Sequence, residues 1–487
     1  MVSKTNLREC STTEMVAYSS GQCANSLIFN GLLGFAMLYY TDALGVSHLL
    51  AGLALSLGVF WDAALDPIMG HISDTTRCRY GRRHPFILIG GLIMAVSFYF
   101  MWAIPDIFKT NTTLIFWYLV AVSLFLRTAY AAYSIPYGAL GFEICTDYMA
   151  RTKLQGIGTV MNMAANLCGP ALAWMIFFQN ENGVRATNVP DNFVHMGTVF
   201  AIASGACVLL VFFLTLKYMQ DSRQMLSSGK GLKGFVVDLK EIVTDIYSRW
   251  VFAYTFVVIM GVALVSSLQM YVYEHFMQFS GTEKTIAHGG SMVGMALGSL
   301  LAVKFVKRWD KKKTVILGCL INVVCHLTLA VLFLPGLLKP GQTITVSHIH
   351  VPIAFIIFVI FHPMYYFGAG VLMPVATSMV ADISEIHQLK SGINKDGTYS
   401  AMFVFAVKCS MSLALLFSGY CLKLVGFATG KDMVQSPVVI WRLCAIVLIV
   451  GPLISITALP LIAKYRVSKG LLEQLRKESD EPVASLT

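Results

Sequence analysis

The sequence predicts an all-α polytopic membrane protein, with 12 transmembrane helices arranged as two halves of six. Hydrophobic residues make up 56% of the 487-residue chain and charged residues only 13%, whereas soluble domains contain about 25% charged residues. The apolar residues fall in runs of about 20, the length that crosses a bilayer as a helix. Because no water satisfies the backbone inside a bilayer, such runs must be helical. This composition excludes a typical soluble enzyme, a coiled coil and a disordered chain.

Twelve segments satisfy this length requirement. The longest polar interruption, residues 218–249, follows the sixth segment and divides the chain into two sets of six. We therefore expect an N-terminal half over 1–217, a cytoplasmic central loop over 218–249, a C-terminal half over 250–464 and a cytoplasmic tail over 465–487. The expected spans lie near residues 15–41, 46–72, 86–104, 114–141, 154–178, 195–217, 250–278, 285–306, 313–335, 350–381, 398–426 and 437–464.

Lysine and arginine residues predict the orientation of these spans. If the N-terminus is inside, the inner loops hold most of them, including the clusters at 77–83 and 304–313, and the outer loops hold few. This imbalance follows the positive-inside rule and predicts that both termini are cytoplasmic. The net charge of +10 then reports topology, so nucleic acid is not expected as a partner. We expect a multi-pass protein of the plasma membrane, which in a bacterium is the inner membrane.

Ionisable residues inside spans are costly and usually functional. Asp62 and Asp66 in the second span are four residues apart, so both lie on one helix face. Two carboxylates this close do not both stay ionised without a cation. The pair predicts a site for H⁺ or, through its oxygens, for Na⁺; a buried salt bridge without a transport role is the alternative. Lys408 in the eleventh span needs an anionic partner, and the candidates are Asp62, Asp66 and an anionic substrate.

Arg127 in the fourth span shares a helix face with Tyr130 and Ser134. A guanidinium group is permanently charged and suits carboxylate, sulfonate or phosphate. Two interpretations stay open: a contact with an anionic substrate, or an ion pair with another helix through a residue such as Glu274.

Two further polar stripes are candidates for a substrate cavity, and their members are Gln22, Ser26 and Asn30 in the first span and Thr159, Asn162 and Asn166 in the fifth. Hydrogen bonding between helices is the alternative, and we favour the cavity. His362 in the tenth span is interpreted as a core histidine in preference to a proton carrier.

Charged residues after the second and tenth spans are candidates for a cytoplasmic gate held closed by salt bridges. They are Asp74, Arg79, Arg82 and Arg83 in the first half and Asp382 in the second. A purely topological role is the alternative.

Three motifs are more specific: YYTD at 39–42, WDAALDPIMG at 61–70 and RYGRRHP at 79–85. With these motifs the chain resembles the glycoside–pentoside–hexuronide:cation symporters, the family of the melibiose carrier. The resemblance implies a major-facilitator fold and cation-coupled sugar symport by alternating access around a site between the halves. It also implies that Asp62 and Asp66 bind the cation and that Lys408 couples the cation site to the sugar site.

The chain departs from this family at both sites. Leu65 and Ala131 stand where the melibiose-type cation site has an Asn and a Thr, which favours H⁺ over Na⁺; if Na⁺ is the coupling ion, Asp62 and Asp66 are its ligands. At the sugar site, two aspartates, two tryptophans and an arginine of the family correspond to Ser26 and Ser134, Gly138 and Met373, and Thr159. With Arg127, these changes predict an anionic sugar or glycoside, such as a uronide or sulfo-sugar, with Met373 in the substrate site.

The alternative cargo is a lysophospholipid, because the related sodium–lysolipid symporters are similar in the paired aspartates and the span-eleven lysine. Loss of two tryptophans would leave room for an acyl chain, and Lys408 could meet a phosphate. We find no HExxH, GxSxG or Cys/His metal motif, so we expect neither an enzyme nor a cofactor besides the coupling ion. The expected partners are the sugar and membrane lipid, and we expect a monomer.

Overall fold

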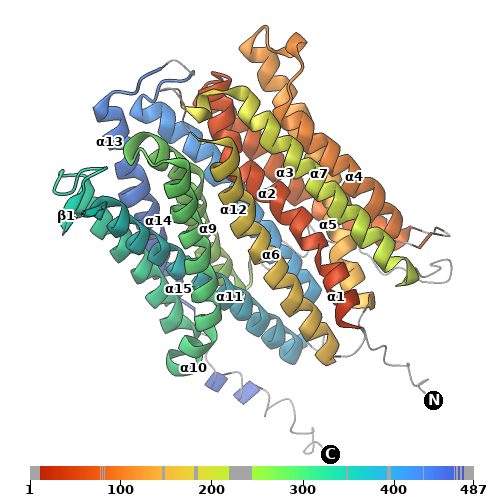
Figure 1. Ribbon diagram of the computed structural model, residues 1–487. Helices are drawn as coiled ribbons and strands as arrows, with labels where there is room; N and C mark the ends of the chain where they lie inside the picture. Colours follow the sequence, from red (N-terminus) through yellow and green to blue (C-terminus); the bar gives the residue numbers. More distant parts are fainter. Residues whose placement is uncertain are drawn as a thin grey trace, which may run out of the picture. The chain divides into compact units, whose positions relative to one another are not determined.

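The computed structural model describes residues 11–218 and 244–475, apart from short gaps, and the part it describes is helical except for one two-stranded hairpin (Figure 1). The gaps are residues 77, 79, 82, 145–147, 180–184, 347–348, 392–395, 431–432, 466, 468–469 and 472–473. The chain forms two compact units, which are described separately.

The first unit contains residues 1–231, 279–289 and 422–435. Its main helices are α1 (Thr12–Ser19), α2 (Gly21–Leu38), α3 (His48–Thr75), α4 (His84–Trp102), α5 (Thr112–Ile144), α6 (Tyr148–Phe177) and α7 (Pro190–Thr215). Shorter turns are the π-helical η1 (Tyr39–Ala43) and the 3₁₀-helical η2 (Asp106–Phe108), η3 (Ala186–Asn188) and η4 (Leu216–Tyr218).

The second unit contains residues 232–278, 290–421 and 436–487. Its helices are α9 (Ser248–Tyr271), most of α10 (Gly281–Phe333), α11 (Ile353–Ser391), most of α12 (Asp396–Val425), α13 (Pro437–Ala445), α14 (Gly451–Thr457) and α15 (Leu459–Ala463). Two π-helical segments, η6 (Val272–Phe276) and η7 (Ile446–Val450), continue α9 and α13. The strands β1 (Ile344–Val346) and β2 (Ile349–Val351) pair antiparallel before α11.

The described residues contain 11 helices that are long and apolar enough to cross a membrane. One of them, α10, has 53 residues and as a straight helix would measure about 80 Å, more than twice the roughly 30 Å hydrocarbon core of a bilayer. It is broken at Asp310, whose φ of 68° and ψ of 163° are not helical. Helix α10 therefore supplies two spans, and the expected 12 spans are confirmed.

Glycines let the helices of the first unit approach closely. Helix α3 packs on α5, and α4 packs on α5 and α7; Figure 1 shows these helices side by side. A Cβ atom at Gly58 of α3 would lie only 2.2 Å from Oγ of Ser123 in α5. A Cβ atom at Gly90 of α4 would lie 3.0 Å from the backbone of Ala132 in α5. Larger residues at these positions would separate α5 from its neighbours.

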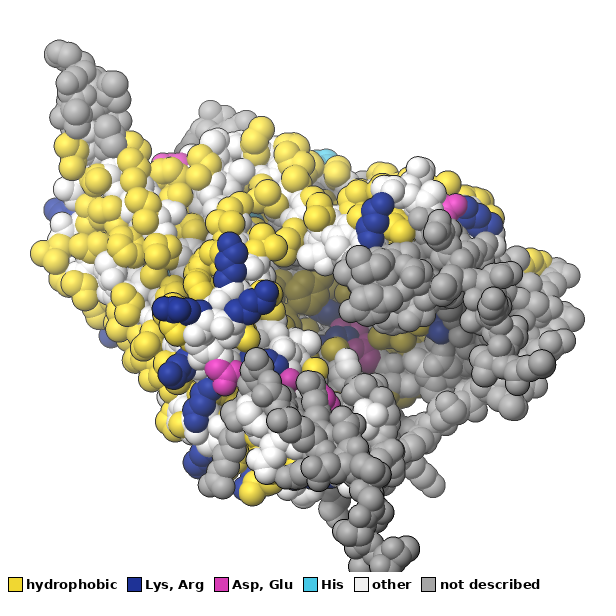
Figure 2. Space-filling view, turned by 90° about the horizontal axis from the view of Figure 1, so that it is seen from below, with side chains coloured by type: hydrophobic (Ala, Val, Ile, Leu, Met, Phe, Trp, Pro, Cys, Tyr) yellow, Lys and Arg dark blue, Asp and Glu magenta, His cyan; other side chains and the backbone are white. Residues whose placement is uncertain are grey.

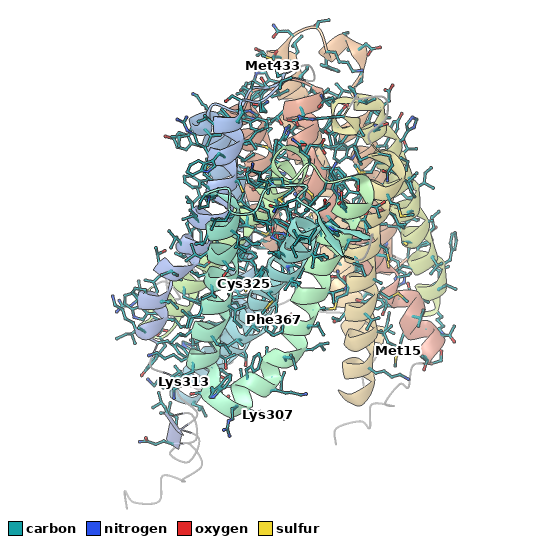
Figure 3. The ribbon with its side chains drawn as sticks, turned by 60° about the vertical axis from the view of Figure 1, so that its left-hand side comes forward. Met15, Lys307, Lys313, Cys325, Phe367 and Met433 are labelled. Atoms are coloured by element: carbon teal, nitrogen blue, oxygen red, sulfur yellow. The ribbon has the colours of Figure 1, made fainter. Side chains whose placement is uncertain are left out.

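Two segments from late in the chain belong to the first unit. In residues 279–289, Thr285 donates a hydrogen bond to the Ala171 carbonyl at 2.9 Å, and the ammonium of the fully buried Lys284 lies 4.6 Å from the centre of the Trp174 ring. In residues 422–435, the backbone N–H of Gly430 donates to the Thr41 carbonyl at 3.0 Å. Figure 3 shows Met433 of this segment and Met15 of α1 at opposite ends of the unit.

Basic side chains lie at one end of the second unit. Figure 3 places Lys307 and Lys313 of α10 at this end, with Cys325 and Phe367 nearer the middle. Exposed basic residues of α10 also include Lys304 and Arg308, and Figure 2 shows lysine and arginine side chains gathered on the face it views. The apolar core of the unit is built mainly from α9, α10, α11 and α12.

Candidate functional site

Asp62 of α3 and Arg127 of α5 form a buried ion pair in the first unit. Nη1 of Arg127 lies 3.5 Å from Oδ2 of Asp62, and the two residues are 6% and 2% exposed. The close approach at Gly58, one turn before Asp62, brings the helices within reach of this contact. The phenol of Tyr130, one turn after Arg127, lies within electrostatic range of both residues. Among the described residues, the ion-pair partner of Arg127 therefore lies on α3.

Asp66 lies one turn after Asp62 on α3 and is half-buried. The next residue, Pro67, lies inside the helix and has no N–H to donate. The carbonyl of Ala63 therefore lacks its usual donor four residues later. Asp62, Asp66 and this carbonyl are the oxygen groups that this stretch of α3 offers to a cation.

The positions that depart from the melibiose-type cation site lie in apolar surroundings. Leu65 and Ala131 are buried in a small cluster with Met69, and none of these side chains carries an oxygen. These positions therefore add no side-chain oxygen to those of Asp62 and Asp66 for binding a cation.

The two polar stripes of the first and fifth spans hydrogen-bond to each other between α2 and α6. Asn30 donates to the side-chain oxygen of Asn166 and, at 2.8 Å, to the carbonyl of Ser26. Asn162 donates to Oγ of Ser26 at 2.7 Å, and Asn166 donates to Asn162 at 2.9 Å. These four side chains therefore join the two helices.

The other predicted substrate residues are placed separately. Gln22 and Ser134 are half-buried, and Thr159 is exposed. A Cβ atom at Gly138, one turn after Ser134, would meet nothing within 4 Å, so space is open at a position where the resemblance implies that a tryptophan has been lost. Met373 lies half-buried on α11 in the second unit.

Lys408 is half-buried on α12 in the second unit. Two residues later, Ser410 donates a hydrogen bond at 2.5 Å to the carbonyl of Phe256 in α9, which fixes this turn of α12 against its neighbour. The coupling of Lys408 to the aspartates stays a prediction.

The predicted cytoplasmic gate residues are described only in part. Arg79 and Arg82 lie outside the described residues, as does the side chain of Asp74, while Arg83 is buried at the start of α4. In the second unit, Asp382 accepts a hydrogen bond from Lys311 at 2.5 Å and lies 3.5 Å from the hydroxyl of Tyr465.

The second unit contains a buried network of polar side chains that the sequence analysis did not predict, although it named one member, His362. His362 of α11 lies 3.1 Å from His326 of α10 and 3.3 Å from Gln269 of α9. A Cβ atom at Gly368 of α11 would lie 1.9 Å from the side-chain oxygen of Asn322 in α10, so this glycine permits the close packing that joins the network. The feature of the sequence that could have indicated this network is the presence of three uncharged polar residues in three separate apolar spans.

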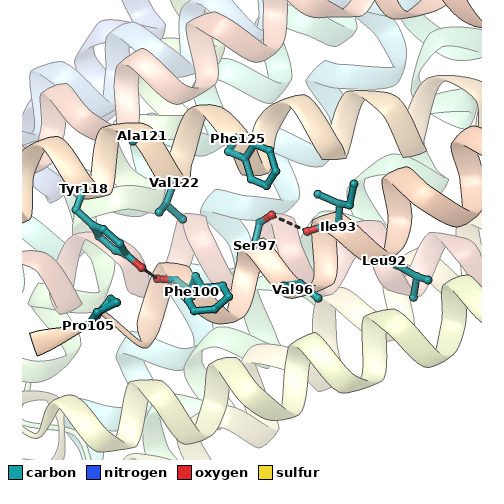
Figure 4. Close-up of a pocket in the computed structure, with 10 residues that line it drawn as sticks. All are labelled: Leu92, Ile93, Val96, Ser97, Phe100, Pro105, Tyr118, Ala121, Val122 and Phe125. Carbon is teal, nitrogen blue, oxygen red and sulfur yellow. Dashed lines mark hydrogen bonds between the residues drawn. The ribbon is translucent and has the colours of Figure 1, made fainter.

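A cavity of about 660 Å³ between α4 and α5 is unsuited to a sugar (Figure 4). Ten residues line it, and most of their side chains are apolar: Leu92, Ile93, Val96, Ser97, Phe100, Pro105, Tyr118, Ala121, Val122 and Phe125. Its two hydroxyl groups donate to backbone carbonyls, Ser97 to Ile93 at 2.6 Å and Tyr118 to Phe100 at 2.9 Å. A surface of this kind matches a lipid environment.

Comparisons with solved structures show the fold. A crystal structure of the nucleoside transporter NupG has a TM-score of 0.64 at 13% identity and covers 94% of this chain and 99% of its own. The inward-open xylose transporter XylE of E. coli has a TM-score of 0.56 at 14% identity and covers 96% of this chain and 97% of its own. Both comparisons show the major-facilitator fold.

Two curated relatives match most of the chain, and a third matches less than half of it. The glucuronide carrier protein homolog of Escherichia coli (strain K12) is 25% identical over 437 residues, 89% of this chain and 88% of its own. The isoprimeverose transporter of Lactiplantibacillus pentosus is 22% identical and covers 86% of this chain and 81% of its own. The sphingosine-1-phosphate transporter MFSD2B of Xenopus tropicalis is 30% identical over 249 residues, 46% of this chain and 48% of its own.

The family is shown by a match to its model over residues 17–469. Fold and family are those of membrane transporters, which are not enzymes. The chain belongs to the MFS/sugar transport protein family.

Proposed function

We propose that the protein is a symporter that couples one monovalent cation, H⁺ in preference to Na⁺, to an anionic sugar or glycoside. The observation that carries the proposal is the buried contact of Arg127 with Asp62 at 3.5 Å. With both carboxylates ionised, Asp62, Asp66 and Arg127 hold one net negative charge. One monovalent cation neutralises the group, which supports a stoichiometry of one.

The ion pair suggests how the cation and substrate are coupled. While Asp62 is ionised, it holds Arg127. A cation that binds at Asp62 cancels the attraction and makes the guanidinium available to the acidic group of a substrate. Nε of Arg127 is a buried donor without a hydrogen-bond partner among the described residues, so a bound anion would satisfy it. The cation therefore binds before the substrate.

Two features support H⁺ as the coupling ion. A proton needs one carboxylate, whereas Na⁺ needs several oxygen ligands. The side chains of Leu65 and Ala131 supply none, and Asp62, Asp66 and the Ala63 carbonyl are the available ligands if Na⁺ is used. Lys408 is proposed to sense the charge of this site from the second half.

Alternating access is proposed to operate between an N-terminal half over 1–217 and a C-terminal half over 250–464, joined by the loop over 218–249. Lys311 and Asp382 are candidates for the cytoplasmic gate, together with Asp74, Arg79, Arg82 and Arg83. Both termini, including the tail over 465–487, are proposed to be cytoplasmic. The protein is proposed to act as a monomer in the plasma membrane.

A lysophospholipid is the second candidate substrate. The 30% identity to a sphingosine-1-phosphate transporter over 249 residues and the open space at Gly138 favour it. A phosphate headgroup would bind the same guanidinium group of Arg127, so the proposed coupling between the cation and an anionic substrate would be the same.

Uptake into proteoliposomes tests the proposal. Radiolabelled glucuronides, neutral galactosides and lysophospholipids are compared under an imposed inward proton gradient, an imposed sodium gradient and no gradient. We expect accumulation of a glucuronide with the proton gradient alone. Accumulation of a neutral galactoside would contradict the anion assignment, a requirement for Na⁺ would contradict the choice of ion, and accumulation of lysophospholipid alone would select the second candidate.

A further inference from the structure

The second unit contains a chain of hydrogen bonds that the proposed symport mechanism does not use. Oγ of Ser266 lies 2.9 Å from the hydroxyl of Tyr366, which donates to Oε1 of Gln269 at 2.6 Å. Nε2 of His362 lies 3.3 Å from the same oxygen, and Nδ1 of His362 lies 3.1 Å from Nε2 of His326. Ser266 is half-buried, and the other four residues are almost completely buried.

The chemistry of the partners fixes the donor in each of these bonds. Oε1 of Gln269 can only accept, so Nε2 of His362 carries a hydrogen. A neutral imidazole has one N–H, so Nδ1 of His362 accepts a hydrogen bond from Nε2–H of His326. Nδ1 of His326 is then an unprotonated nitrogen. No described side chain hydrogen-bonds to this nitrogen, and the backbone of Val447 in η7 lies against the His326 ring.

Aromatic rings stack on both imidazoles. The Tyr365 ring stacks on His326, with centroids 3.8 Å apart, and the Phe358 ring stacks on His362, with centroids 4.9 Å apart. Aromatic faces attract cations, more strongly where water is absent. The backbone of Val447 in η7 lies against the His326 ring, and its carbonyl is the backbone group that can accept a hydrogen from a ring nitrogen.

We propose that His326 and His362 form a second proton-binding site, in which one added proton is shared between the two rings. A hydronium ion gives up one proton, which forms a new N–H bond at Nδ1 of His326, and a water molecule is left. The hydrogen on Nε2 of His326 can then move to Nδ1 of His362, which transfers the positive charge to His362. The carbonyl of Val447 and Oε1 of Gln269 accept hydrogen bonds at the two ends. The site lies in the second unit and does not depend on the cation site of the first.

Other polar and titratable groups belong to the same neighbourhood, and those packed around the pair are Tyr273 of η6, Gln269 of α9, Asn322 of α10 and Tyr365 and Tyr366 of α11. Glu274 and His275 follow Tyr273 in η6 and are both buried. A carboxylate at position 274 would favour the protonated pair, and a charged imidazole at 275 would oppose it.

Nitrogen NMR of histidine tests the proposal without any substrate. The full-length protein, labelled with ¹⁵N-histidine and held in lipid vesicles, is titrated from about pH 8 to about pH 5, the range in which histidine ordinarily gains its charge. We expect an imidazolium signal that disappears in both His326→Gln and His362→Gln and persists in Asp62→Asn. The exposed His195 of α7 is the internal reference. If both rings keep neutral signals throughout this range, the proposal is wrong, whether or not sugar symport is found.

Matched variants identify what stabilises the charge. Gln269→Glu places a carboxylate beside His362 and should raise the proton affinity of the pair by about tenfold or more. Tyr365→Leu removes the aromatic face over His326, whereas Tyr365→Phe keeps it. We expect a lower proton affinity in Tyr365→Leu and little change in Tyr365→Phe. Unchanged affinity in Gln269→Glu, or equal effects of the two Tyr365 variants, would overturn the assigned geometry.

Discussion

The first unit contains a buried ion pair between Asp62 and Arg127. The second unit contains a buried network in which hydrogen bonds join three neutral side chains, His326, His362 and Gln269. A buried ion pair is stable mainly because each charge compensates the other, and removal of one partner is costly. A hydrogen bond between neutral groups contributes only about 0.5–1.5 kcal/mol.

Under the two proposals, one added proton has opposite consequences in the two units. At Asp62 it removes a charge and releases Arg127, so it weakens an existing contact. At His326 it adds a charge that the neighbouring oxygens and aromatic faces can stabilise, so it strengthens the network. The first site is therefore suited to a coupling switch and the second to proton storage.

Arg127→Gln should have the largest effect on stability. The substitution removes the guanidinium charge that faces the buried Asp62, and the expected loss is about 3–5 kcal/mol in the free energy of unfolding. Thermal unfolding of the purified protein measures it.

The double variant Asp62→Asn/Arg127→Gln is the matched control for that prediction. It removes both charges and should recover most of the lost stability. If the single and double variants are equally destabilised, the ion pair is not the cause of the loss.

Asn162→Leu should have the next largest effect, because it breaks hydrogen bonds between the polar side chains that join α2 and α6. Ser26 and Asn166 would each lose a hydrogen-bond partner, and the expected loss is about 1–3 kcal/mol. Urea or thermal unfolding in detergent measures it. Val160→Leu, at an exposed position of α6, is the control and should change stability little. Equal losses in the two variants would show that these hydrogen bonds are not what holds the helices together.

Asp62→Asn tests the switch itself. The amide cannot be ionised, so it should leave Arg127 available and remove the dependence of substrate binding on pH. With one coupled proton, each unit of pH gradient can drive up to about tenfold accumulation, and the variant should lose this accumulation while it retains exchange of substrate across the membrane. Asp106→Asn, at an exposed position of η2, should retain accumulation. Proton-driven accumulation by Asp62→Asn would contradict the mechanism.

The fold class and the members of the charged site could be predicted because both depend on composition along the chain. Apolar runs determine the spans, and Asp62, Asp66 and Arg127 stand out because charged residues inside spans are rare. The partner of Arg127 could not be predicted, and Glu274 was one suggestion. Arg127 pairs with Asp62 because α3 and α5 lie close together, and Gly58 allows this close approach. The order of residues along the chain does not show which helices pack together.

The neutral network could not be recognised in the same way. His326 and Gln269 are uncharged, and single polar residues are common in membrane helices, where they usually bond to the backbone or to a neighbouring helix. His362 taken alone is best interpreted as a core histidine. Only the meeting of α9, α10 and α11 shows that three unremarkable positions form one continuous chain of hydrogen bonds.

His362→Gln should have the smallest effect on stability. Glutamine can still donate to Gln269 or accept from His326, so at most one neutral hydrogen bond is lost, about 0.5–1.5 kcal/mol. Thermal unfolding at neutral pH should therefore place this variant well above Arg127→Gln. His362→Leu is the sharper variant, because it removes one hydrogen-bond partner from both His326 and Gln269 and should cost more than His362→Gln. If His362→Gln were as destabilising as Arg127→Gln, the second unit would already hold a charge at rest, and the contrast between a charged site and a neutral one would fail.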